Sequence, residues 1–193
     1  MDAMAGVQED FTKMVTHLFK SGEEMQKELT VMDLELIHAV MGISGEADEI
    51  VSAINDEDDE NLLEELGDIE FYLNKLRTLL ELPEHNPVDE NEIDEALKIQ
   101  AHSREFLEGF KDGVNILAGR TLDLVKKATI YRKPLKRDEV AEELKDFDIC
   151  LQVAYRALKI DREEVLRYNI NKLGKRYKNG YSNQAAQDRA DKN

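Results

Sequence analysis

The chain carries one helical pattern twice, and this duplication limits its fold more than any other feature. Residues 45–73 and 119–151 share an outline in which two acidic pairs, each spaced i,i+3, lie on successive predicted helices. The first copy keeps both pairs, and its carboxylates are Glu46, Glu49, Glu65 and Asp68. The second copy has Arg120 at the first of these positions, followed by Asp123, Glu143 and Asp146. We therefore expect two similar helical units of which one carries a working site.

The composition is typical of an all-α protein. Only three prolines occur among 193 residues, and 35% of the residues are charged, with many Glu, Lys, Leu and Ala. No apolar run approaches the roughly 18 residues of a membrane span, and residues 1–11 lack the pattern of a signal peptide. The single cysteine, Cys150, excludes an internal disulfide and is expected as a small core residue of a cytoplasmic protein.

The charge is distributed very unevenly between the two halves. Residues 1–96 hold 5 Lys and Arg against 27 Asp and Glu, whereas residues 97–193 hold 21 against 15. The total of −16 argues against binding to a nucleic-acid polymer, which needs a basic surface. An acidic, metal-bearing half packed on a basic half is the prediction, and an ordinary charge bias on solvated helix faces is the alternative.

Apolar periodicity predicts helices at about 7–20, 31–54, 61–82, 104–131, 138–158 and 161–177. Two of the three prolines lie in 81–92, an acidic segment that includes the Asn86–Pro87 step and reads as an exposed linker. The predicted organisation is a first unit at 1–82, a linker at 83–96 and a second unit at 97–193. Neither unit buries enough apolar surface alone, so a bundle in which both form an intramolecular pseudo-dimer is expected.

The acidic pairs of the first unit are candidate metal ligands. Spacing of i,i+3 places both side chains of a pair on one helix face, and two adjacent helices would bring all four carboxylates together. Such a cluster repels itself unless a cation lies between the groups, and oxygen ligands suit Mg²⁺, with Mn²⁺ as a substitute. Solvated acidic faces are the alternative, because this spacing is common in a chain with 42 acidic residues.

Two segments carry a family resemblance. The run GISGEADEIVSAI, followed by ENLLEELGDIEFYL, resembles the MazG-like nucleotide pyrophosphohydrolases, particularly small phage-type members of the all-α NTP pyrophosphatase superfamily. Their signature, ExxE on one helix and ExxD on the next, is matched by the four carboxylates of the first unit. The ending NINKLGKRYKNGYSNQAAQDRAD is also similar to the ending of that family.

The resemblance implies magnesium-dependent hydrolysis of a nucleoside triphosphate to a monophosphate and pyrophosphate, with deoxynucleotides as the expected substrates. It implies that the four carboxylates are both the metal ligands and the catalytic residues. The residues expected to contact the substrate are Asn169, Lys172, Arg176, Tyr177 and Tyr72. Glu64 is a weaker candidate for orienting water. His38, on the helix of the first acidic pair, is expected to be a partly buried structural histidine.

The chain departs from the family in how these motifs are distributed. The first unit keeps the acids but lacks the basic ending, whereas the second unit keeps the ending but has Arg120, which is expected to neutralise Asp123, Glu143 and Asp146. We therefore expect one site shared by both units, in which the first unit supplies the metal ligands and the second unit supplies the phosphate-binding residues. A dUTPase- or dCTPase-like enzyme and a catalytically inactive nucleotide- or protein-binding bundle are the alternatives. A cytoplasmic location is expected (the host cytoplasm if phage-encoded), and a homodimer of pseudo-dimers is the candidate assembly. The preferred base and the oligomeric state stay open.

Overall fold

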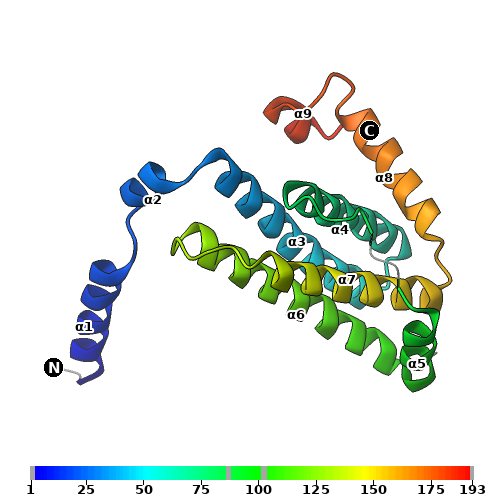
Figure 1. Ribbon diagram of the computed structural model, residues 1–193, viewed down its shortest axis with the longest axis horizontal. Coiled ribbons are helices and arrows are strands. Elements are labelled where there is room, and N and C mark those ends of the chain that lie inside the picture. Colours follow the sequence, from blue (N-terminus) through cyan, green and yellow to red (C-terminus); the bar gives the residue numbers. More distant parts are fainter. Residues whose placement is uncertain (1–2, 86–87, 101–103, 192–193) are drawn as a thin grey trace.

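Side-chain caps set the starts of the helices that carry the acidic pairs. Thr30 caps α3 (Val31–Asn55) and exchanges hydrogen bonds with Asp33 in a capping box, and the Asp58 carboxylate caps α4 (Asp59–Leu79). The computed structural model describes residues 3–85, 88–100 and 104–191 and, within these ranges, contains helices and no strand (Figure 1). The other helices are α1 (Ala3–Leu18), α2 (Gly22–Glu28), α5 (Glu90–Gln100), α6 (Arg104–Thr129), α7 (Arg137–Leu158), α8 (Arg162–Arg176) and α9 (Asn183–Asp188). The predicted all-α class is confirmed.

Four long helices form the body of the molecule. α3 packs against α4 and against α6, and α6 packs against α7. Their buried apolar side chains belong to one continuous core, which joins Leu66 and Ile69 of α4 to Leu144 and Phe147 of α7. The core therefore spans both predicted units.

The two halves of the chain also meet through polar contacts that follow the charge asymmetry. Arg132 after α6 pairs with Asp33 near the start of α3 at 2.8 Å, and Lys111 near the start of α6 donates to Asn55 at the end of α3. These contacts show that α3 and α6 run antiparallel. In both, the basic residue comes from the second half of the chain.

A buried ionic junction joins α4 to α7. The Arg77 guanidinium, 1% exposed, donates to the Asp148 carboxylate at 2.6 Å and to the Leu144 carbonyl oxygen at 3.3 Å. His85 Nδ1 lies 2.9 Å from the same oxygen of Asp148. Removing one partner from such a pair would cost about 3–5 kcal/mol, because the other charge would stay buried.

The chain changes partner helix after α7. Lys159 ends α7 in the left-handed region, with φ of 57°, and α8 then packs on α4 of the first unit. The start of α8 is held by Glu70 of α4, whose carboxylate receives a bidentate bond from Arg162 at 2.6 and 2.9 Å and a bond from the Tyr155 hydroxyl at 3.0 Å. Thus α8, from the predicted second unit, lies beside α4, the acidic helix of the predicted first unit.

Two other segments differ from expectation. α5 begins within the predicted linker, at Glu90, and continues past its end at residue 96. It packs on α7 and buries Ile93, while the Asn86–Pro87 step of the linker falls outside the described ranges. The helix predicted at about 7–20 corresponds to α1, whereas α2 was not predicted, and both extend away from the four-helix body (Figure 1). No helix in the part of the chain that the structure describes is long and apolar enough to cross a membrane.

Candidate functional site

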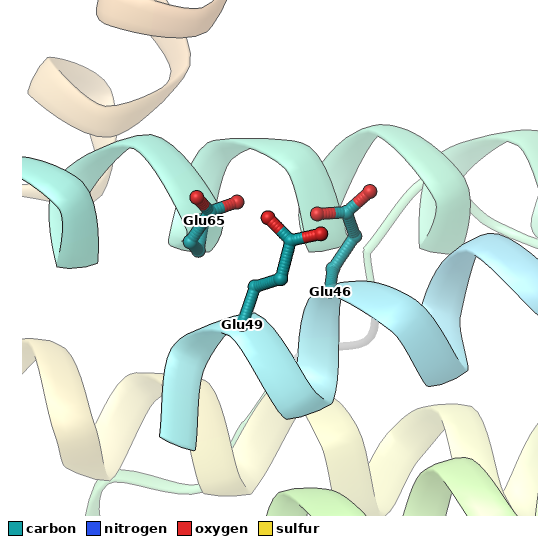
Figure 2. A group of neighbouring side chains, drawn as sticks. All are labelled: Glu46, Glu49 and Glu65. Carbon is teal, nitrogen blue, oxygen red and sulfur yellow. The ribbon is translucent and has the colours of Figure 1, made fainter. Parts of the chain in front are cut away.

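Three carboxylates of the first unit converge between α3 and α4. Figure 2 shows Glu46 and Glu49 projecting from α3 toward Glu65 on α4. One carboxylate oxygen from each residue lies within 4.8 Å of the other two. Glu65 is buried, Glu46 is half-buried and Glu49 is exposed, so the group opens to solvent on one side.

The electrostatics of this group disfavour three free anions. Burial, followed by repulsion from Asp68 and Glu49, raises the pKa of Glu46 to about 8. Burial, followed by repulsion from Glu49 and Asp68, raises the pKa of Glu65 to about 7. A hydrogen bond between the side chains of Glu46 and Glu65 favours a proton on Glu46. A divalent cation would take over the role of that proton and allow all the carboxyls to ionise.

The donor set fits a hard cation. It consists of carboxylate oxygens on two packed helices, without a nitrogen or sulfur ligand, which is the set that Mg²⁺ and Mn²⁺ accept. Within the described ranges, this is the group of acidic side chains close enough to share one ion.

Asp68, the fourth predicted ligand, is engaged by α8. Its Oδ1 accepts a hydrogen bond from Asn169 Nδ2 at 2.5 Å, and its Oδ2 is ion-paired with Lys172 Nζ. Lys172 is 6% exposed and also lies 3.4 Å from Glu64 Oε1. The structure thus brings Asn169 and Lys172 of α8 against Asp68 of α4.

A glycine permits this close approach. A Cβ atom at Gly67 would lie 2.9 Å from Cβ of Asn169, so a larger residue there would push α8 away from α4. Gly42 serves α3 in the same way, because a Cβ atom at Gly42 would lie 2.4 Å from the ring of Tyr72. The two glycines place the Asn169 amide and the Tyr72 ring against helix backbones.

Tyr72 borders the acidic group. Burial, followed by the charges of Glu46 and Asp68, raises the pKa of the Tyr72 phenol. Its ring makes edge-on contacts with His38 at 5.8 Å and with Phe71 at 5.2 Å between centroids. The expectation of a partly buried His38 is wrong, because this residue is exposed to solvent.

The remaining predicted substrate residues lie at the end of α8. Arg176 donates to both oxygens of Asp191 at 2.6 and 2.7 Å, and this pair lowers the pKa of Asp191 to about 2. Tyr177 ends α8 and lies 5.6 Å from the ring of Tyr181. A substrate phosphate at Arg176 would therefore compete with a carboxylate of the chain's own C-terminal segment.

Glu64, the weaker candidate for orienting water, is buried and bonded to two cationic side chains. Its carboxylate is 5% exposed and accepts bonds from Lys172 and from Arg189, both at 3.4 Å. These contacts tie the C-terminal segment to α4.

The second unit departs from its predicted ion pairing. Arg120 lies 3.9 Å from Glu143, but Asp123 pairs instead with Lys126 at 2.7 Å and Lys127 at 2.5 Å. The expectation that Arg120 neutralises Asp123 is wrong, because nearer cations occur one turn along the same helix. Glu143 Oε2 is buried without a hydrogen-bond partner among the described atoms.

The Glu70–Arg162 pair was not anticipated from sequence. Arg162 does carry a signal, because a cation in the first turn of a helix opposes the helix dipole and so suggests a partner elsewhere. Glu70 carries a weaker one, since it falls among apolar residues of α4.

Comparison with known families supports the resemblance over one part of the chain. Residues 35–81 match the sequence model of the MazG nucleotide pyrophosphohydrolase domain, and this segment holds all four predicted ligands. Neither a curated protein nor a solved structure matches the chain. The match supports a MazG-like family and, in general terms, a nucleotide pyrophosphohydrolase activity. Enzymes of that family generally depend on a divalent metal, and the acidic group between α3 and α4 offers ligands for one.

Proposed function

We propose that the protein is a magnesium-dependent pyrophosphohydrolase that converts a (d)NTP and water to the (d)NMP and pyrophosphate. The observation that carries the proposal is the convergence of three glutamates beside a buried lysine and an asparagine from α8. Anionic ligands for a cation and donors for a phosphate thus lie next to each other. Deoxynucleotides of the cellular pool are the proposed substrates.

The chain's own residues supply binding and orientation. Glu46, Glu49 and Glu65, joined by Asp68, would hold the ion, which supplies neutralisation of phosphate charge and activation of water for in-line attack. Lys172 carries the charge-assisted donor that a phosphate oxygen requires.

Asn169, Arg176 and Tyr177 would orient the phosphates and the sugar from α8. Tyr72 would limit the space beside the reacting phosphate, because its ring is fixed against Gly42. Site residues from both units then act on one substrate.

Matching dimensions support a tandem repeat of two MazG-like units. α3 and α6 contain 25 and 26 residues, and α4 and α7 contain 21 and 22. Glu81 and Lys159 adopt left-handed φ values of 51° and 57°, and they lie 13 residues after Asp68 and Asp146, the last residues of the matched acidic pairs. Helix lengths and helix ends therefore recur together, which is the pattern expected of a duplicated unit.

We also propose that two copies of the chain pair through α1. Val7, Phe11, Met14 and Leu18 are 47–70% exposed, and their alternating spacing of four and three is that of a coiled-coil seam. α1 carries few charges, with Glu9 paired to Lys13 at 2.7 Å, so two α1 helices would repel little despite the charge of −16.

The test of the function is pyrophosphate release from a panel of ribo- and deoxynucleoside triphosphates, with Mg²⁺ or with EDTA. Release of pyrophosphate from a subset of nucleotides, abolished by EDTA, is expected. Glu49→Gln should lower the rate by about 100-fold, since it removes one of few metal ligands.

Asp48→Asn is the matched control, because Asp48 is the exposed neighbour of Glu49 on α3 and lies outside the converging group. Its rate should stay at the wild-type value. Absence of release from every nucleotide with Mg²⁺ or Mn²⁺ would refute the enzyme and leave a binding role.

A further inference from the structure

Asp68 stands apart from the other three predicted ligands because both of its oxygens already have partners. Asn169 donates to Oδ1, and the Lys172 ammonium is paired with Oδ2. The group close enough to share one ion contains Glu46, Glu49 and Glu65 without Asp68. The fourth ligand is therefore present next to the site but bonded to α8.

Because Lys172 is buried, its ion pair with Asp68 is costly to break unless another anion replaces the Asp68 carboxylate. Its side chain is 5% exposed and lies between the carboxylates of Asp68 and Glu64. If Lys172 left Asp68, this buried ammonium would keep, among the residues that the structure describes, only Glu64, at 3.4 Å, as an anionic partner, so its displacement from Asp68 is favoured when another anion takes the place of that carboxylate. A phosphate oxygen supplies equivalent charge and hydrogen-bond acceptors.

We propose that Lys172 is a latch that holds Asp68 away from the metal ligands until a substrate phosphate takes its place. Asp68 then turns to the three glutamates and completes the set of four. This inference rests on the proposed function, and it adds that phosphate binding and the fourth metal ligand are coupled through one lysine.

The proposal predicts that removal of Lys172 raises the affinity of the site for metal. A lysine that only binds phosphate would affect metal affinity in the absence of nucleotide through its charge alone, and its removal would then have the same effect with or without the Asp68 carboxylate. A lysine that restrains Asp68 lowers that affinity, so its removal should raise it. By reciprocity, nucleotide and metal should each strengthen the binding of the other in the wild type.

The test is Mn²⁺ binding to the full chain without nucleotide, measured by electron paramagnetic resonance. Lys172→Met should bind Mn²⁺ about tenfold or more tightly than the wild type, the scale on which groups beside metal ligands act. The gain should disappear when Lys172→Met is combined with Asp68→Asn. Nucleotide hydrolysis by Lys172→Met should fall, because the phosphate loses its partner.

Lys175→Met is the matched control, since it removes one positive charge from an exposed position of the same helix. It should change Mn²⁺ affinity by less than about twofold, because exposed charges are screened. Lys172→Gln, which keeps a polar group, serves if Lys172→Met fails to show a wild-type helical circular dichroism spectrum.

Unchanged or weaker Mn²⁺ binding by folded Lys172 variants would overturn the latch, even if the wild type releases pyrophosphate. Tighter binding that persists in the Asp68→Asn background would also overturn it, because the gain would not pass through Asp68. Tighter binding that depends on Asp68, with no pyrophosphate release by the wild type, would support the latch and refute the hydrolase.

Discussion

At the scale of single residues, the protonation of Glu46 and Glu65 links the candidate site to stability. The folded protein raises the pKa values of these carboxyls to about 8 and about 7, from an ordinary value of 4.5. Between pH 4.5 and 8 the folded state therefore binds more protons than the unfolded state. Its free energy of unfolding must fall as pH rises through this window.

We expect the metal-free protein, kept in EDTA, to lose thermal stability between pH 5 and pH 8. For a chain of this size, each kcal/mol lost lowers the Tm by about 2–4 °C. Glu46→Gln should lose less over the same window, because its amide does not ionise, and Mg²⁺ should restore wild-type stability most at pH 8. Differential scanning calorimetry measures all three effects.

Comparing the variant with the wild type cancels the general effect of pH on a chain with a charge of −16. Asp48→Asn should follow the wild-type curve. A wild-type Tm that rises from pH 5 to 8 in EDTA, or a Glu46→Gln curve parallel to it, would contradict the prediction.

At the scale of elements, the packing of α8 on α4 decides whether the site is complete. Glu70 and Arg162 fix the start of α8, and Gly67 lets its middle approach α4 at Asn169. Lys172, one turn beyond Asn169, reaches Asp68 only while this register holds.

Gly67→Ala should therefore reduce catalysis without unfolding the protein. The added methyl group would lie 2.9 Å from Asn169 Cβ and displace α8. Because a shift of about 1 Å can cost up to 10²-fold in rate, we expect kcat/KM to fall about 10- to 100-fold. Pyrophosphate release and calorimetry on the same sample would separate activity from stability.

Gly119→Ala is the control, since Gly119 is exposed on α6 with nothing within 4 Å of its added Cβ. It should keep wild-type activity and gain about 0.5–1 kcal/mol from the higher helix propensity of alanine. Equal activity of Gly67→Ala and the wild type would show that the Gly67 contact does not position the site.

At the scale of the whole molecule, one core and several ion pairs join the halves, and an uncovered apolar surface remains. α1 exposes its seam, and Val31, Leu34 and Met41 of α3 are 54–76% exposed. Such an exposed apolar surface is typical of an interaction site, and the proposed pairing of two copies would cover part of it.

We expect the wild type to have about twice the chain mass of 22.1 kDa in light scattering at micromolar concentration. Phe11→Glu combined with Leu18→Glu should yield the monomer mass, because burial of two carboxylates in the seam would destabilise the dimer. Thr12→Glu combined with Thr16→Glu adds the same charge on the other side of α1 and should stay dimeric. A monomeric wild type would refute pairing.

Much of the local structure follows from the sequence alone. The predicted helices at 31–54, 104–131 and 138–158 end within two residues of the observed α3, α6 and α7, because periodicity and caps act over one or two turns. Helical spacing places Glu46 and Glu49 on one face of a helix. The expectation that the next helix along the chain packs beside it then brings Glu65 to the same face.

The partners of individual side chains do not follow from sequence. Arg176 meets Asp191, and His38 is exposed beside Tyr72. Spacing along one helix fixes a face but not the groups that the face meets, which depend on how distant segments pack.

The sequence by itself determined the helices, the acidic pairs and the opposite charges of the halves, since these depend on short-range periodicity and composition. The tertiary structure alone decided that α8 crosses to α4, that Lys172 pairs with Asp68, and that α1 is left uncovered. The physical reason is that burial of one shared core selects the partner of each helix. That selection depends on the whole chain and not on any single segment.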